Sequence, residues 1–217
     1  YNPATHPLRR SSMRITLAAT DSELASAWRD LCGGLADVSV HQGSILDLDV
    51  DAVVSPANSF GFMEGGLDGV YRRHFGGHVQ ERLQALLRAQ HDGELPVGRA
   101  EIIAIEHPRI RWLIAAPTMR VPMSVAGTAH PFLAARAALR LVKQGHFAPG
   151  SGGEGHVSHA VTSLAMPGLG TGTGGVPPRV CAAQVRVAIE EVILGRVHRF
   201  ADLRAALAAH DCLVRGT

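Results

Sequence analysis

One stretch of the sequence indicates the fold most clearly, and it is Asp51-Ala52-Val53-Val54-Ser55-Pro56-Ala57-Asn58-Ser59, followed closely by Gly65-Gly66-Leu67-Asp68-Gly69. The segment 52–55 has the composition of a buried strand and is too short for a helix. Loops at the carboxyl ends of parallel strands are where α/β proteins bind ligands, and glycines there let backbone N–H groups approach a phosphate. The stretch therefore predicts a strand that leads into a ligand-binding loop.

A second glycine-rich loop, Gly168-Leu169-Gly170-Thr171-Gly172-Thr173-Gly174-Gly175, follows an apolar segment at 161–166 that we also expect to be a strand. No Lys follows these glycines, so the loop is not a Walker A motif. Its simplest role is a tight turn into the helix that begins at Pro177. Two loops of this kind in one chain indicate a ligand with a diphosphate.

The rest of the chain alternates between strand and helix patterns. We expect further strands at 13–18, 38–41, 100–105 and 112–116, and helices from 21 or 22 to 31, around Val70 and Tyr71, and at 77–88, 130–142 and 177–194. A last amphipathic segment, 201–209, is expected to pack on the edge. Such alternation predicts an α/β layered sheet with helices on both faces. We expect one domain over 13–217, preceded by an N-terminal extension at 1–12.

The composition is that of a globular protein. Of the 217 residues 46% are hydrophobic and 18% charged, and the net charge is +2, which does not by itself favour a nucleic-acid partner. The three cysteines lie far apart and form no C-x-x-C motif, so neither a disulfide framework nor a zinc ribbon is indicated. With no apolar run long enough for a bilayer and no signal peptide, we expect a cytoplasmic protein without a membrane partner.

Asn58 and Asp68 are the candidate catalytic pair. Taken singly, the Asn is more often a turn former, and the Asp is equally well explained as an acid in the first turn of a helix. Together they flank one loop that could bring both side chains to the same bound group. An Asn can both donate to and accept from a sugar hydroxyl, and an Asp can act as a general base. A neighbouring diphosphate would raise the pKa of that Asp toward neutrality.

These motifs resemble the macrodomain family. The resemblance rests on Val50-Asp51-Ala52-Val53-Val54 with Ala57-Asn58-Ser59, on Gly65-Gly66, and on Gly170-Thr171-Gly172 with Gly175 and Pro177, in the family's order. It covers roughly 13–194. It implies a three-layer α/β/α fold with a mixed, mostly parallel central sheet, and a site for ADP-ribose without a metal or cofactor.

The resemblance also implies roles for individual residues. Asn58 and Asp68 would meet the distal ribose, as in MacroD-type hydrolases that remove ADP-ribose from acidic side chains. The diphosphate would lie between the two loops. The implied ligand contacts are Ser44, Ile45, Ala57, Gly65, Gly66, Leu67, Gly170, Thr171, Gly172, Thr173 and Gly174. Arg120 is implied to lie near the ligand.

Several positions depart from the family pattern. Ser44 stands where an Asp usually accepts from the adenine amino group, so we expect weaker adenine recognition. Gly174 stands where an aromatic residue often covers the distal ribose, which leaves that face open unless Phe60 or Phe62 fills it. Lys143 is the only lysine and lies far from Asn58, so subgroups with a catalytic Lys near the ribose are not indicated.

The resemblance thus implies an ADP-ribosyl hydrolase that acts on ADP-ribosylated protein at acidic side chains or related ester linkages. Two alternatives remain open. The chain could bind ADP-ribose without turnover, as a reader, or act as a deacylase or phosphatase on small ADP-ribose derivatives. ADP-ribosylated nucleic acid is a further partner that the small net charge does not favour.

Overall fold

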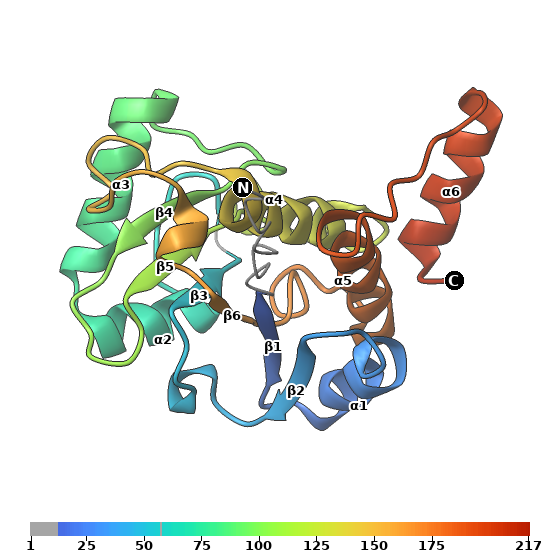
Figure 1. Ribbon diagram of the computed structural model, residues 1–217, viewed down its shortest axis with the longest axis horizontal. Helices are drawn as coiled ribbons and strands as arrows, with labels where there is room; N and C mark the ends of the chain where they lie inside the picture. The colour runs from blue at the N-terminus through green and yellow to red at the C-terminus, as the bar shows by residue number, and fades with distance from the viewer. Residues whose placement is uncertain (1–12, 57) are drawn as a thin grey trace, which may run out of the picture.

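The computed structural model describes residues 13–56 and 58–217, so the predicted extension at 1–12 and the predicted contact at Ala57 lie outside the described residues. The described chain forms a six-stranded sheet (Figure 1). The strands are β1 (Arg14–Ala19), β2 (Val38–Gln42), β3 (Ala52–Ser55), β4 (Glu101–Ala104), β5 (Trp112–Ala115) and β6 (Ser163–Met166). Every strand expected from the sequence is present, with bounds shifted by at most two residues.

The strand order is β2-β1-β6-β3-β5-β4, and all neighbours are parallel except β4, which pairs antiparallel with β5. This confirms the mixed, mostly parallel sheet. The central strand β6 lies between β1 and β3, with Leu164 in register with both Ile15 and Ala52. The carboxyl ends of the parallel strands consequently meet at one edge of the sheet, where α/β folds bind ligands.

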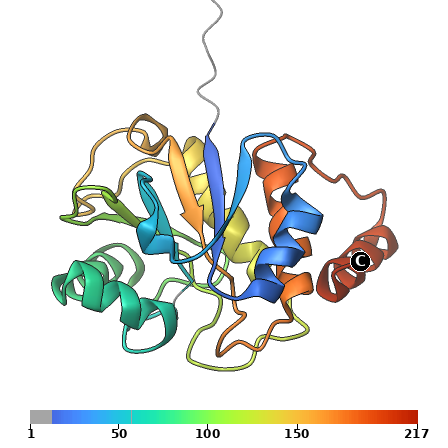
Figure 2. The same ribbon diagram turned by 90° about the horizontal axis from the view of Figure 1, so that it is seen from below.

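Helices cover both faces of the sheet, which confirms the three-layer α/β/α architecture (Figure 2). One face carries α1 (Ser22–Cys32), α4 (His130–Gln144) and α5 (Pro178–Val192), and the other carries α2 (Gly66–Phe75) and α3 (His78–His91). Successive strand residues alternate between these layers, because side chains of a strand point to opposite faces. Val54 and Ile114 pack in the first core, whereas Val53 and Leu113 pack in the second.

The start of β6 is tied to the start of β3 by Asp51. Its carboxylate accepts hydrogen bonds from the backbone N–H groups of Thr162 and Ser163, at 2.9 and 3.0 Å, and from Arg111 at 2.8 Å. Burial raises the pKa of Asp51, but these bonds outweigh it and lower the pKa to about 2. The two strands that carry the glycine loops are thereby held in fixed register at their amino ends.

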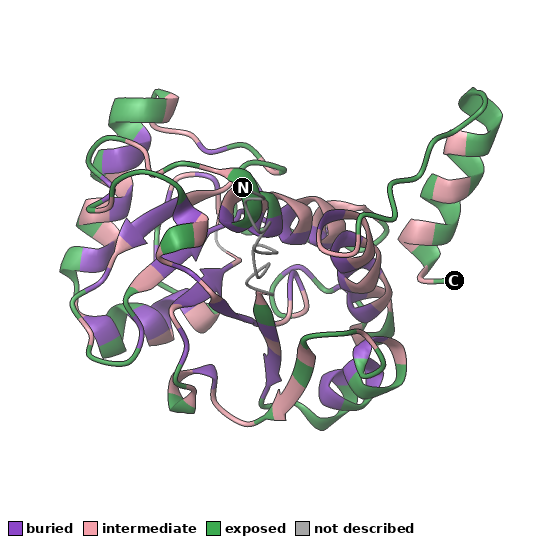
Figure 3. Cartoon of the chain, in the orientation of Figure 1, coloured by how far each residue is buried: buried purple, intermediate pink, exposed green. Residues whose placement is uncertain are grey.

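The last helix, α6 (Leu203–Arg215), is longer than the amphipathic segment 201–209 that the sequence predicts. It stands apart from the layers and meets the rest of the molecule beside α5 (Figure 1). None of its residues is buried, and Leu203 and Leu207 are exposed (Figure 3). The predicted packing on the edge is therefore slight. Across the described residues, no helix has the length and apolar character needed to cross a membrane.

Candidate functional site

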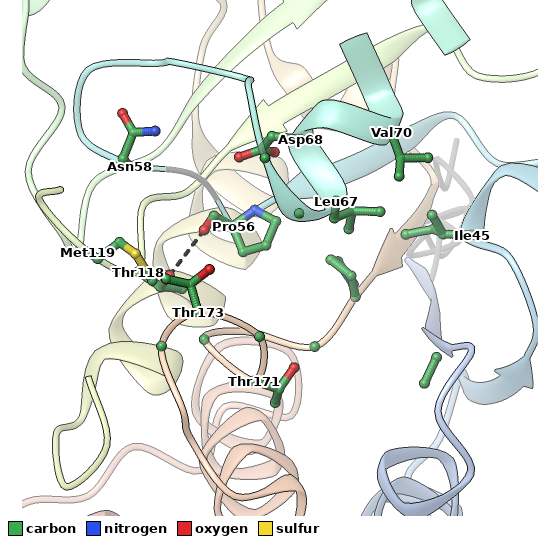
Figure 4. A pocket seen from close by; sticks show the side chains of 18 of the residues that line it. Ile45, Pro56, Asn58, Leu67, Asp68, Val70, Thr118, Met119, Thr171 and Thr173 are labelled. Carbon is green, nitrogen blue, oxygen red and sulfur yellow. Dashed lines mark hydrogen bonds between the residues drawn. The ribbon is translucent and has the colours of Figure 1, made fainter. Parts of the chain in front are cut away.

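A cavity of about 740 Å³ opens at the carboxyl ends of β1, β2, β3 and β6. Its walls include the predicted catalytic pair and all the predicted glycine-loop, Ser44 and Ile45 contacts that the structure describes. Asn58 and Met119 lie at one end of the cavity and Ile45 at the other, with Leu67, Thr171 and Thr173 between them (Figure 4). The two glycine loops thus form the middle of one elongated site.

The first loop ends at the amino terminus of α2, which points into the cavity. Gly65 occupies the N-cap position and makes no side-chain hydrogen bond, and Gly66 has a φ of 55°, which favours glycine. The first hydrogen bond of this helix runs from Gly69 N–H to Gly65 O. The N–H groups of Gly66, Leu67 and Asp68 precede that bond and have no partner within the helix, so they can bind an anion.

The second loop is a compact turn. Val176 N–H donates to Gly170 O at 3.0 Å, and Gly175 N–H donates to Gly172 O at 2.9 Å. Gly170 has a φ of 71°. Within the described residues, the backbone N–H groups of 170–174 have no hydrogen-bond partner. Both loops therefore present free amides to the same cavity.

The cavity contains no cationic side chain among its described lining residues, whereas three carboxylates, Asp21, Glu64 and Asp68, line it. A bound anion would therefore be held by backbone amides and by the dipole of α2 rather than by ion pairs.

Asp68 is the buried acid of the site, with 8% of its surface exposed. It lies in the first turn of α2, and its Oδ1 accepts a hydrogen bond of 2.5 Å from Ser55 Oγ at the end of β3. Burial raises the pKa of Asp68 from 3.8 to about 6, and the Ser55 bond offsets this only in part. The raised pKa expected from a neighbouring diphosphate is thus already present without one, and its cause is desolvation.

Asn58 lines the cavity but directs its amide into its own loop. Its Oδ1 accepts from the N–H groups of Phe60 and Phe62, at 3.1 and 3.3 Å, and its Nδ2 donates to Phe62 O at 2.8 Å. Its backbone forms a parallel bridge with Met119. This is the turn-forming role considered from the sequence, and it fixes the shape of the 58–62 loop at this end of the cavity.

Comparison with known proteins places this architecture in a family. The family model for the Macro domain matches residues 54–185. An uncharacterized protein of Aquifex aeolicus is 35% identical over 156 residues, which are 72% of this chain and 81% of that protein.

The chain belongs to the Macro domain family.

Solved macrodomains share its fold at low identity. The Oceanobacillus iheyensis macrodomain with ADP superposes with a TM-score of 0.56 at 20% identity, over 78% of this chain and 86% of that one. Thermosipho africanus DarTG in complex with ADP-ribose superposes with a TM-score of 0.52 at 16% identity, over 81% of this chain and 50% of that one.

The departures of this macrodomain from the family pattern have local explanations. A Cβ at Gly174 would lie 2.5 Å from Gly170 O and 2.8 Å from a methyl group of Val125, so the turn leaves no room there for an aromatic side chain.

Arg120 is not among the lining residues, contrary to the sequence-based expectation. Its guanidinium pairs with Glu94 at 2.7 and 2.9 Å and lies 5.1 Å from the Phe60 ring centroid, so it braces the outside of the 58–62 loop.

Ser44 has a structural role at the opposite end. Its Oγ accepts from Leu46 N–H at 3.2 Å and so caps the short helix η1 (Ile45–Asp47). Two site residues were missed by sequence reasoning. Ser55 bonds to Asp68 across thirteen positions of chain, and Asp21, which the sequence indicated only as a possible start of a helix, also lines the cavity. The one available signal for Asp21 was its place directly after a parallel strand.

Proposed function

We propose that this macrodomain is an ADP-ribosyl hydrolase that releases ADP-ribose from ester-linked acceptors, acidic protein side chains above all. The observation that carries the proposal is Asp68, a buried carboxyl with a pKa of about 6 on the wall of a cavity lined by two amide-rich loops. A general base is most effective when its pKa lies near the working pH.

The cavity suits the ligand. The free amides of Gly66 and Leu67 face the same space as those of 170–174, so a diphosphate held between them would satisfy both sets. ADP and ADP-ribose are the ligands named for the Oceanobacillus and Thermosipho structures, which supports a nucleoside diphosphate here. The distal ribose would then lie toward Asn58 and Asp68, and the adenosine toward β1 and β2.

In this proposal Asp68 acts on a water molecule at the anomeric carbon of the distal ribose. The water oxygen forms the new bond to that carbon as the ester oxygen leaves with its electron pair, and Asp68 accepts the proton that the water loses. Ser55 holds one carboxylate oxygen so that the other is free for the proton. Positioning a water and a base in this way contributes several orders of magnitude to the rate.

Asn58 shapes the ribose end of the site. Its three hydrogen bonds hold the 58–62 loop, and this loop places Phe60 and Phe62 on the cavity wall. The sequence-based role, a direct bond to the ribose, requires the amide to exchange at least one of these bonds for the sugar.

The engagement of the Asn58 amide in its own loop favours the alternative of a reader, which would bind ADP-ribose without turnover. A release assay separates the two. Wild-type protein is expected to bind ADP-ribose more tightly than about 10 μM and to release it from a glutamate-linked substrate. Asp68→Asn should keep the binding and lose at least about a hundredfold in rate. Asp211→Asn, exposed on α6, is the control and should behave as wild type.

Equal rates for wild type and Asp68→Asn would refute the role of Asp68, and binding without any release would establish a reader. Turnover of O-acetyl-ADP-ribose or ADP-ribose-1''-phosphate, without turnover of modified protein, would instead support the small-molecule activity.

A further inference from the structure

The cavity continues beyond the two amide-rich loops to an end formed by the carboxyl ends of β1 and β2. The residues there are 18–21 and 43–46. Ile45 marks this end in Figure 4, opposite Asn58 and Met119. With the diphosphate between the loops and the ribose at Asn58, as the proposed function has it, the nucleoside base occupies this end. The inference below therefore rests on that function.

Few polar side chains are available to the base. The Ser44 hydroxyl already caps η1. Thr20 is exposed and uncharged, so the one charged group at this end of the described cavity lining is the carboxylate of Asp21.

Asp21 is held in a defined position. It is the N-cap of α1, with φ −75° and ψ 131°, and its Oδ1 accepts from Leu24 N–H at 2.8 Å. Leu24, whose N–H donates this bond, is buried in the core between α1 and the sheet. The second carboxylate oxygen has no hydrogen-bond partner in the part of the chain that the structure describes. One oxygen thus anchors the side chain, and the other remains able to accept a bond from a ligand.

We propose that Asp21 is a specificity-determining residue that selects a nucleoside base bearing an exocyclic amino group. An ionised carboxylate only accepts hydrogen bonds. The amino group of adenine donates to it, whereas the oxygen that replaces this group in hypoxanthine also carries lone pairs and is repelled. A site that bonds a ligand N–H discriminates against the analogue lacking it. Asp21 thereby supplies the acceptor that Ser44 does not.

The test compares ADP-ribose with its hypoxanthine counterpart by calorimetry. Wild-type protein is expected to bind ADP-ribose about tenfold more tightly, the value for one charge-assisted hydrogen bond at an exposed site. Asp21→Asn should reduce this ratio to about twofold or less, because an amide offers a donor as well as an acceptor. Asn caps helices as well as Asp does, so α1 should be retained, which circular dichroism checks.

Asp202→Asn is the matched control. Asp202 caps α6 through the same kind of hydrogen bond, accepting from Ala205 N–H at 2.8 Å, and it does not line the cavity. This variant should keep the tenfold preference. A wild-type protein that binds both dinucleotides equally, or an Asp21→Asn variant that keeps the preference, overturns the inference and leaves ADP-ribose binding intact. Failure of wild type to bind either dinucleotide refutes the proposed function, and this inference with it.

Discussion

Asp68 should make the folded protein less stable at neutral pH than it would be with an uncharged side chain. Its pKa is 3.8 in an unfolded chain and about 6 in the folded one, so protons bind more tightly to the folded state. The stabilisation by the protonated form is complete below pH 4 and is lost as the pH rises through 6. Two pKa units correspond to about 3 kcal/mol.

Asp68→Asn removes this titration and keeps the shape. The amide oxygen of Asn can still accept from Ser55 Oγ, which donates to Asp68 at 2.5 Å in the native protein. We expect the unfolding free energy of the variant minus that of wild type to be about 3 kcal/mol larger at pH 7 than at pH 4.

Urea denaturation of both proteins at intervals from pH 4 to pH 8 measures the effect. Only the difference between their unfolding free energies is used, so the other titrating groups cancel. That difference should rise between pH 4 and pH 6 by about 1.4 kcal/mol per pH unit and then level off. A difference that does not change with pH would show that Asp68 is ionised without cost, and the argument from burial would be refuted.

Three further variants test neighbouring features. Ser55→Ala removes a hydrogen bond that lowers the pKa of Asp68, so the acidic limb of the hydrolysis rate against pH should move to higher pH. An acidic limb at the wild-type pH would show that Ser55 does not influence the catalytic base. Gly174→Ala places a Cβ 2.5 Å from a carbonyl oxygen and should weaken ADP-ribose binding at least about tenfold. Gly77→Ala, outside the cavity and with open space around its Cβ, is the control and should bind as wild type does. Equal calorimetric affinities of the Gly174 variant and wild type would count against the turn as the anion site. Asp51→Ala should cost about 2 kcal/mol at pH 7, and because the pKa of Asp51 falls from 3.8 to about 2 on folding, the loss in urea melts should shrink only as the pH drops below 4.

The strands were predictable because their sequence signals are local. The segment 52–55 is bounded by a charged residue and a proline, and β3 has those bounds. Helix α3 continues to His91, three residues beyond the expected end. Its stop is Asp92 with a φ of 52°, a left-handed conformation that the apolar pattern does not reveal.

Side-chain pairing in the site could not be predicted in the same way. The partners of Asn58 are backbone groups of its own loop, and which of them it meets depends on the path of 58–62 rather than on residue type. The bond between Ser55 and Asp68 joins a strand end to a helix start, so it appears only when α2 packs on the sheet. The crowding at Gly174 likewise depends on Val125, which is distant in sequence.

The amide-lined cavity has a consequence for how the protein would respond to its medium. Anion sites built from Lys and Arg lose affinity as salt is added, because ions of the medium compete with and screen their charges. Here neutral dipoles at contact distance would hold the phosphates, and the formal charges that the described residues place on the walls, Asp21, Glu64 and Asp68, oppose the ligand. Added electrolyte would weaken that opposition and leave the amide contacts intact. The affinity of such a protein for its anionic ligand at high salt is at least equal to its affinity in dilute buffer.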